Sequence, residues 1–299
     1  MNELLRLSPE VREALASARP VVALETTLVA HGFPQPEGME VALASERRVR
    51  EAGAVPATVG VLDGEIRIGL SPDELRRFGE AGSAARKVGP RDLAACAVAR
   101  ALGATTVGGT LAAARAAGIR FLGTGGLGGV HRGFPTPPDI SADLAELART
   151  AVLVTSSGVK SLLDVPATAE VLETLGVPVL GFRTDELPLF YTSRGGPPVS
   201  ARVETAKEAA EIARAHWAIG GAGLLLGRPP ADGLDDVEPL IERAVAEARA
   251  QGVTGGAVTP FVLAQLHRES EGRTVPVNKV LIADNAALAA QVAVAHAGL

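Results

Sequence analysis

The chain has 299 residues, of which 47% are hydrophobic, and a net charge of -5, so it can bury a substantial core at the upper end of single-domain size. Its first twenty residues carry charges at Glu3, Arg6 and Glu10 and contain no long apolar run, which argues against a signal peptide or a membrane span. The acidic balance and nine aromatic residues provide no basic, stacking surface for a polynucleotide. We therefore expect a cytoplasmic protein with one domain over residues 1–299.

Short apolar runs that fit buried strands alternate with amphipathic segments that fit helices. The expected strands cover residues 20–25, 57–70, 104–109, 119–123, 150–157, 177–182 and 222–227. The expected helices cover residues 39–53, 71–82, 140–150, 201–217 and 234–252. This alternation predicts an α/β fold with helices on both faces of a largely parallel sheet. A turn at Asp63-Gly64 adds an antiparallel hairpin, and the apolar stretch 275–296 predicts a core or interface helix with Asn285 near its start.

A glycine-rich segment follows the expected strand at 119–123. Gly123, Gly125 and Gly128 match the spacing of the dinucleotide-binding fingerprint. That fingerprint must open a helix, whereas this chain continues into GVHRGFPTPPDIS, where three prolines oppose a helix. We therefore do not expect a nicotinamide cofactor.

The same glycines allow a tight loop whose N–H groups converge on an anion, with His131, Arg132 and Asp139 following it. Alternatively, the glycines serve backbone geometry alone. A metal bound by one carboxylate, waters and substrate oxygens would be magnesium or manganese, because the chain has no Cys/His cluster with zinc spacing.

Lysine is rare in this chain. Of the 29 basic residues, four are lysines: Lys87, Lys160, Lys207 and Lys279. Arginine cannot form a Schiff base, so a catalytic lysine would resist replacement by arginine. Lys160 ends the run AVLVTSSGVK, where apolar walls would favour its neutral, nucleophilic amine; alternatively it snorkels at the start of a helix. Lys207, with Glu204 and Glu211 at helical spacing, fits a solvated ion pair.

Two further charged residues follow or precede expected elements. Glu25 ends an apolar strand, so it either caps N–H groups or donates a proton with a raised pKa. Lys87 precedes a proline and an expected helix, where a phosphate could dock. Cys96 lies among small apolar residues and is expected to be an inert buried thiol.

Several blocks together resemble one family. They are ALETTLVAHGFPQP, RKVGPRDLA, TTVGGT, GTGGLGGVHRG, PDISADL, VTSSGVKSLLDVPAT, LETLGVPVLGF and AVTPFVL. In this order, from about residue 20 to the C-terminus, they resemble the pseudouridine-5'-phosphate glycosidases, also called indigoidine synthase A-like proteins. The resemblance implies a three-layer α/β/α fold, a homotrimer and reversible cleavage of pseudouridine 5'-phosphate to uracil and ribose 5-phosphate.

The resemblance also implies roles for individual residues. Lys160 would be the nucleophile, Glu25 the proton donor that helps to open the ribose ring, and Asp139 the ligand of a manganese ion, with magnesium as an alternative. Substrate contacts are implied for Lys87, Val107, Ser141, Ala142, Asp143 and, at the uracil edge, Asn285.

The reaction explains the need for a lysine. A C–C glycosidic bond has no heteroatom leaving group to protonate, so paired carboxylates suit it poorly. A lysine adduct at the anomeric carbon supplies an iminium instead, and uracil departs protonated at carbon. Two other functions stay open: another Schiff-base lyase or aldolase on a sugar phosphate, which would release no uracil, and a non-catalytic nucleotide-phosphate binding protein, which would not need Lys160 as a nucleophile.

Overall fold

The structure is a computed structural model that describes residues 3–133, 139–234, 236–253 and 257–299. Its centre is an eleven-stranded sheet with the order β1-β4-β3-β2-β7-β9-β13-β11-β12, and β6, with β5 beside it, branches from β3. The strands of this sheet are β1 (Leu5–Leu7), β2 (Val21–Glu25), β3 (Val55–Leu62), β4 (Glu65–Ile68), β5 (Arg86–Val88), β6 (Gly103–Thr105), β7 (Phe121–Gly123), β9 (Leu153–Ser156), β11 (Val179–Phe182), β12 (Ala201–Val203) and β13 (Leu224–Gly227). A separate antiparallel pair joins β8 (Val130–His131) to β10 (Leu163–Asp164).

The run from β3 through β2, β7, β9, β13 and β11 to β12 is parallel throughout. The predicted hairpin is confirmed, because β3 and β4 pair antiparallel across Asp63 and Gly64. Both turn residues have positive φ values, 54° and 90°, which is the conformation that a two-residue hairpin requires.

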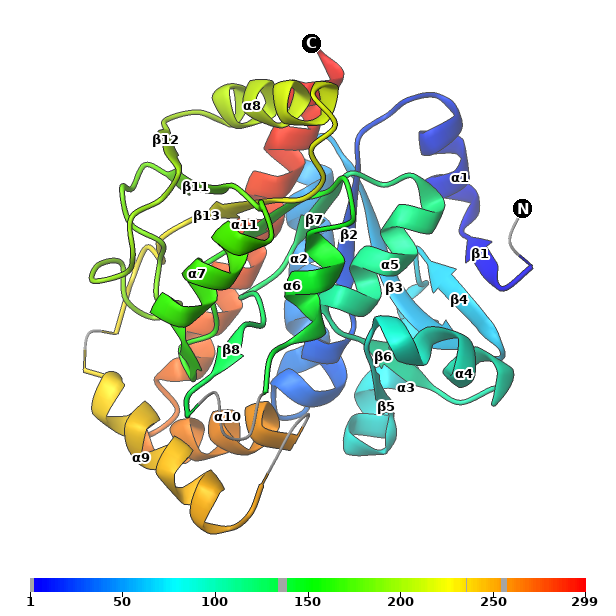
Figure 1. Cartoon of the computed structure of the whole chain (residues 1–299). Helices are drawn as coiled ribbons and strands as arrows, with labels where there is room; N and C mark the ends of the chain where they lie inside the picture. Colours follow the sequence, from blue (N-terminus) through cyan, green and yellow to red (C-terminus); the bar gives the residue numbers. More distant parts are fainter. Residues whose placement is uncertain (1–2, 134–138, 235, 254–256) are drawn as a thin grey trace.

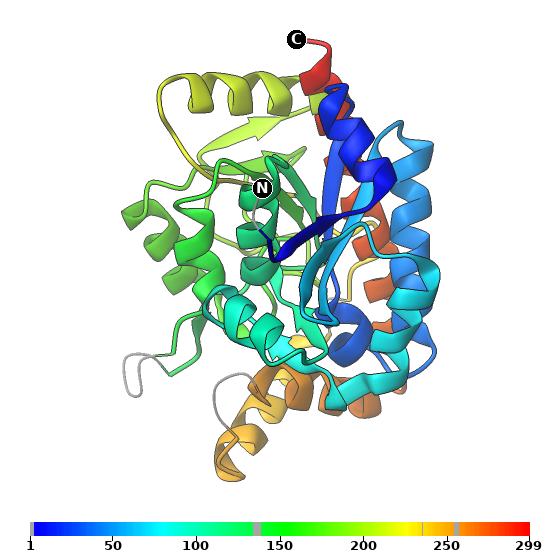
Figure 2. The same ribbon diagram turned by 90° about the vertical axis from the view of Figure 1, so that its right-hand side faces the viewer.

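Helices cover both faces of the sheet, so the predicted three-layer α/β/α fold is confirmed (Figures 1 and 2). The α-helices are α1 (Pro9–Ala16), α2 (Glu37–Glu51), α3 (Pro72–Ala81), α4 (Leu93–Val98), α5 (Val107–Ala117), α6 (Ala142–Leu147), α7 (Val165–Thr174), α8 (Ala206–Ala218), α9 (Glu238–Ala250), α10 (Val258–Glu269) and α11 (Thr274–Ala297). Short helical turns cover Leu28–Gly32, Gly82–Ala84 and Pro90–Asp92.

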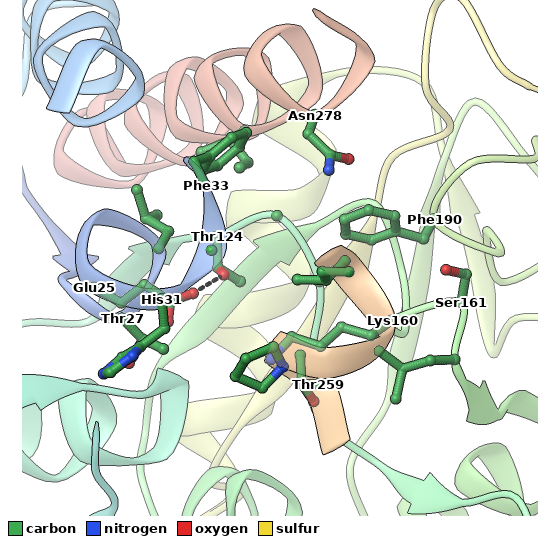
Figure 3. Close-up of a pocket in the computed structure, with 18 of the residues that line it drawn as sticks. Glu25, Thr27, His31, Phe33, Thr124, Lys160, Ser161, Phe190, Thr259 and Asn278 are labelled. Carbon is green, nitrogen blue, oxygen red and sulfur yellow. Dashed lines mark hydrogen bonds between the residues drawn. The ribbon is translucent and has the colours of Figure 1, made fainter. Parts of the chain in front are cut away.

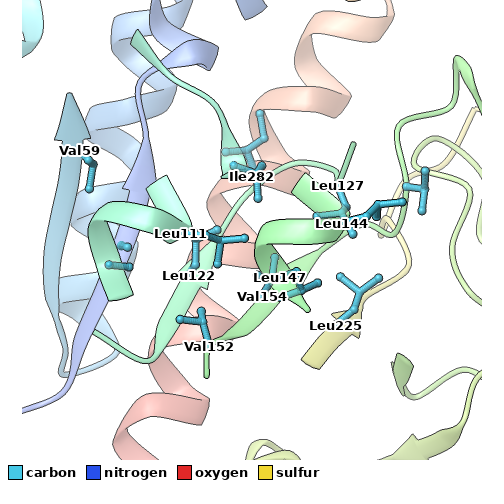
Figure 4. Packing of buried hydrophobic residues seen from close by; sticks show 14 of the residues in the cluster. Val59, Leu111, Leu122, Leu127, Leu144, Leu147, Val152, Val154, Leu225 and Ile282 are labelled. Carbon is cyan, nitrogen blue, oxygen red and sulfur yellow. The ribbon is translucent and has the colours of Figure 1, made fainter. Parts of the chain in front are cut away.

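Successive side chains of the central strands point to opposite faces of the sheet, so the hydrophobic core is divided between these two faces. On β2, Val22 and Leu24 pack with the α11 side of the sheet, whereas Val21 and Ala23 pack with residues of α5 and α6 on the other side. The cluster on the α5 and α6 face also includes Leu122 of β7. Figure 4 shows that this cluster continues across the sheet. Because both faces are buried, the strands read as continuous apolar runs rather than alternating ones.

The structure corrects three local predictions. The expected strand at 104–109 ends at Thr105, because Thr106 caps α5 by accepting a hydrogen bond from Gly109 N. The expected helix at 201–217 is strand β12 followed by α8. Asn285 lies in the middle of α11 rather than near its start.

The last helix combines the length and mean hydropathy of a membrane span with the contacts of a core helix. The α11 helix has 24 residues, and its most apolar window has a mean hydropathy of 1.4. However, it packs against α2, α8 and strands β2, β7 and β9. The burial of its inward-facing alanines and leucines against the sheet explains this apolar composition.

Candidate active site

Three adjacent parallel strands end at one edge of the sheet and bring the candidate residues together. Glu25 is the last residue of β2, Thr124 directly follows β7, and Lys160 lies four residues beyond β9. These strands are neighbours in the order β2-β7-β9. In doubly wound folds, ligands bind at the carboxyl ends of such strands, and Glu25, Thr124 and Lys160 line one pocket there (Figure 3).

The glycine segment and the Lys160 segment are held together by main-chain hydrogen bonds. Ser157 N donates to Gly125 O at 2.9 Å, and Lys160 N donates to Leu127 O at 3.1 Å. Residues 124–133 contain no helix, so the objection to a dinucleotide-binding fingerprint is confirmed. The loop instead fixes the main chain of the candidate nucleophile.

Glu25 is positioned to carry a proton. The residue is only 6% exposed, and Thr124 Oγ1 donates a hydrogen bond to its Oε1 at 2.5 Å. Burial raises the pKa of Glu25, although the positive charge of Lys160 and the hydrogen bond from Thr124 oppose the rise. A carboxyl group whose protonated form is favoured in this way can act as a general acid.

Two lysines, Lys87 and Lys160, lie close enough to influence each other electrostatically. Burial and the neighbouring positive charge of Lys160 lower the pKa of Lys87 to about 8, while Asp143 and Glu25 act in the opposite direction. Lys87 comes from β5, on the other side of β3 from β2. The pocket therefore places two amines, of Lys87 and Lys160, within electrostatic reach of the buried carboxyl group of Glu25.

The pocket also contains residues that the sequence analysis did not select. The lining includes Thr27, Leu28, His31, Phe33, Gly126, Phe190, Thr259, Pro260, Leu263, Asn278 and Ile282. Asn278 lies on α11, donates its amide to Tyr191 Oη at 3.0 Å, and its buried Oδ1 accepts no hydrogen bond from the described residues. Its seven-residue spacing from Asn285, on the same face of an apolar helix, was a signal that would have found it.

The segment after β2 contributes His31, to which no role was assigned from the sequence. His31 belongs to a π-helical turn, Leu28–Gly32, directly after β2. Its Nε2 is buried without a hydrogen-bond partner among the described residues, and burial, followed by the charge of Lys87, lowers its pKa. A neutral imidazole at this position can accept a hydrogen bond from a ligand.

Other predicted substrate-binding residues lie behind the glycine loop. Asp143 accepts hydrogen bonds from Gly108 N at 2.7 Å and from Gly128 N at 3.0 Å. Ser141 caps α6 by accepting from Asp143 N at 3.2 Å, and Ala142 is the first residue of that helix. These residues support the site from beneath, and their contact with substrate stays a prediction.

Val107 and Asn285 are fully buried and do not line the pocket. Val107 begins α5. Asn285 donates its amide to Thr124 O at 2.9 Å and to Ser157 Oγ at 3.1 Å. In this geometry it clamps the two loops together, and its predicted contact with a base remains untested.

Asp139 offers a partial metal site. Its side chain is 35% exposed, and its Oδ2 lies 3.8 Å from His131 Nδ1. Within the described ranges, no cluster of three His, Cys, Asp or Glu side chains could enclose an ion. The donor set therefore fits an ion such as Mn²⁺ or Mg²⁺ that keeps waters and takes phosphate oxygens from a substrate, and it does not fit an all-protein cage.

A buried carboxyl group and two lysines at the carboxyl edge of a doubly wound sheet define an α/β enzyme site suited to lysine adduct chemistry. The chain belongs to the family of indigoidine synthase A like proteins, whose model matches residues 10–295. It is 47% identical to a pseudouridine-5'-phosphate glycosidase of Herpetosiphon aurantiacus over 99% of this chain and 98% of the relative. It is 50% identical to one of Streptomyces griseus over 97% and 92%, respectively.

A solved structure agrees with this membership. The prealnumycin C-glycosynthase AlnA, in complex with ribulose 5-phosphate, superposes with a TM-score of 0.90 and is 39% identical, covering 100% of this chain and 98% of that one. The predicted family and fold are thereby confirmed.

Proposed function

We propose that this protein is an enzyme that cleaves the C–C glycosidic bond of pseudouridine 5'-phosphate and releases uracil and ribose 5-phosphate. The observation that carries the proposal is the shared pocket of Lys160 and Glu25, in which burial raises the pKa of the carboxyl group. The relatives named as pseudouridine-5'-phosphate glycosidases support the substrate. The ribulose 5-phosphate in complex with the C-glycosynthase AlnA, a pentose phosphate, supports the sugar half.

The residues can carry the reaction in balanced steps. The Lys160 amine bonds to C1' of the ribose while the C1'–O4' bond breaks, and Glu25 gives its proton to O4'. Glu25 then takes the proton that the adduct nitrogen loses. The nitrogen lone pair forms a C1'=N bond as C1' separates from C5 of uracil, and C5 takes the proton that Glu25 now carries. Water then adds to the C1'=N bond and gives a proton back to Glu25, and the C–N bond breaks to free ribose 5-phosphate and the neutral lysine amine.

Two other residues recognise the substrate in this proposal. Lys87, in its charged form, neutralises phosphate. Asn278 Oδ1, which accepts no hydrogen bond from the described residues, accepts from an N–H group of the base, because pseudouridine leaves two ring N–H groups free. A buried acceptor left without a donor costs free energy, so it favours a ligand that supplies one.

Metal, assembly and location complete the proposal. Asp139 would hold a manganese ion, which would supply positive charge beside the phosphate when bound. The protein would be a homotrimer in the cytoplasm. Loss of manganese-induced thermal stabilisation in Asp139→Asn tests the first point, and the mass in solution by light scattering tests the second.

The test of function compares the wild type with Lys160→Ala on pseudouridine 5'-phosphate, with manganese present, and traps adducts with borohydride. We expect uracil release and a sugar phosphate on Lys160 in the wild type, and neither in the variant. A trapped adduct without uracil would favour another sugar-phosphate lyase. Binding that survives in Lys160→Ala, with no turnover in the wild type, would favour a binding protein.

A further inference from the structure

The loop that carries Lys160 has a second anchor besides the glycine segment. Arg132 Nη2 donates to Ser161 O at 2.9 Å, and its Nε donates to Leu163 O at 3.3 Å. Both acceptors are main-chain carbonyls within three residues after Lys160. A single guanidinium therefore holds the main chain just beyond the nucleophile, while Leu127 O holds the N–H of Lys160 itself.

Arg132 also contacts α9, the helix that packs on α10. Its Nη2 lies 2.7 Å from Oε1 of Glu238, the first residue of α9. In return, Arg249 of α9 donates to the main-chain carbonyl of Arg132. The two helices pack on each other and lie side by side at the lower end of the molecule in Figure 1, and α10 supplies Thr259 and Pro260 to the pocket wall.

We propose that Arg132 is a positioning residue, which fixes the Lys160 loop and sets its place relative to the helices that wall the pocket. The inference rests on the proposed function of Lys160. The lysine stem is flexible, so the position of its nitrogen depends on where the loop holds its Cα. Attack on carbon requires the reacting atoms to be about 3 to 3.5 Å apart, and a displacement of about 1 Å can cost roughly 100-fold in rate.

The three contacts of Arg132 require an arginine. Its planar fork presents donors in several fixed directions, whereas a lysine ammonium is a point charge on a flexible stem. The Arg132 side chain is 25% exposed and that of Glu238 52%, so the charge pair itself contributes little. The hydrogen bonds to the two main-chain carbonyls are therefore the contacts that hold the Lys160 loop, and Glu238 orients the Arg132 guanidinium.

The experiment measures single-turnover trapping of a sugar phosphate on Lys160 with borohydride in wild type, Arg132→Lys and Arg132→Met. Arg243→Met is the matched control, because Arg243 pairs with Glu269 between α9 and α10 without touching the loop. We expect both Arg132 variants to slow trapping and kcat by about 10- to 100-fold, with KM changed less than about threefold. Glu238→Gln should lose less than about threefold, and Arg243→Met should match the wild type.

A wild-type rate in Arg132→Lys would overturn the proposal, as would a loss confined to KM. The same slowing in Arg243→Met would show that any weakening of the helix pair has this effect, and it would also overturn the proposal. Trapping is measured with ribose 5-phosphate as well as with pseudouridine 5'-phosphate. If the wild type forms no trapped adduct with either sugar phosphate, both the proposed function and this inference are refuted. If the wild type forms the adduct and the Arg132 variants form it at the same rate, only the positioning role of Arg132 is refuted.

Discussion

The side chain of Lys160 passes directly beside Gly126. A Cβ added to Gly126 would lie 3.2 Å from Cγ of Lys160 and 2.7 Å from the ring of Phe190. The backbone of Gly126 has no positive φ, so any residue could adopt its conformation. The glycine is therefore required by space, and the absence of its side chain determines where the lysine stem lies.

Gly126→Ala should consequently leave the fold intact and impair the reaction. The added methyl group must displace Phe190 or the lysine stem, and we expect kcat to fall by about 10- to 100-fold with adduct trapping slowed in parallel. The control is Gly298→Ala, where a Cβ would have only contacts of 3.6 Å or longer. A Gly126→Ala enzyme with wild-type kcat would contradict this role.

Glu25→Gln tests the general acid. Glutamine keeps the shape of the side chain but cannot give up a proton, so kcat should fall by roughly 100- to 10,000-fold. The matched control is Glu46→Gln: burial also raises the pKa of Glu46, which accepts a hydrogen bond from Thr58 but lies outside the pocket. Equal losses in both variants would indicate a general effect of buried carboxyl groups.

The pH profile tests the same assignment. The proton on Glu25 is needed at the start of the reaction, and burial raises its pKa above the ordinary value of 4.5. Activity should therefore be present below that raised pKa and fall as the pH increases through it. Measurement of kcat against pH in the wild type and in Glu25→Gln should show this limb only in the wild type, and a limb that persists in the variant would assign it to another group.

Lys87 should reduce stability while it supports binding. Its pKa falls from an ordinary value of 10.5 to about 8 in the folded protein, so between these values the unfolded chain binds more protons and stability increases with pH. Lys87→Met should therefore increase the free energy of unfolding at pH 7 by at most about 3 kcal/mol, and Tm should rise with it. This gain should shrink towards pH 10. Lys207→Met, at an exposed ion pair with Glu211, should show no such gain.

The same titration affects the substrate. As the pH rises through the lowered pKa of Lys87, about 8, its positive charge is lost, so KM for pseudouridine 5'-phosphate should rise. Lys87→Arg keeps its charge at every accessible pH, and its KM should not increase over that range. A KM that rises equally in both enzymes would assign the effect to a different group.

Asn278 and Asn285 should behave differently although they lie on one face of α11. Asn278→Leu removes the free buried Oδ1 in the pocket, and we expect KM to increase by about 10- to 100-fold and inhibition by uracil to weaken. The variant also loses the hydrogen bond to Tyr191 Oη, so its Tm should fall as well. Asn285→Leu breaks the contacts to Thr124 O and Ser157 Oγ. That variant should lower Tm, and a specific loss of uracil binding in it instead would restore the role predicted from the sequence.

Much of the fold and part of the site follow from local patterns in the sequence. Runs of apolar residues set the buried strands, and the Asp63-Gly64 turn set the hairpin. Glu25 and Lys160 could be selected because Glu25 ends an apolar strand, Lys160 closely follows another, and parallel strands end at a shared edge. These signals depend on neighbours in sequence, so periodicity and turn chemistry reveal them.

Only the tertiary structure decided which polar groups remain available to a ligand. Asn285 contacts Thr124, 161 positions away in the chain, and this contact occupies its amide NH2 group. Its Oδ1, like that of Asn278, accepts no hydrogen bond from the described residues, but Asn285 does not line the pocket. Asn278 was left with a free acceptor, and Arg132 was directed at the loop after Lys160. Such roles depend on hydrogen bonds between segments that are distant in sequence, and no local pattern encodes which donor meets which acceptor once the chain has packed.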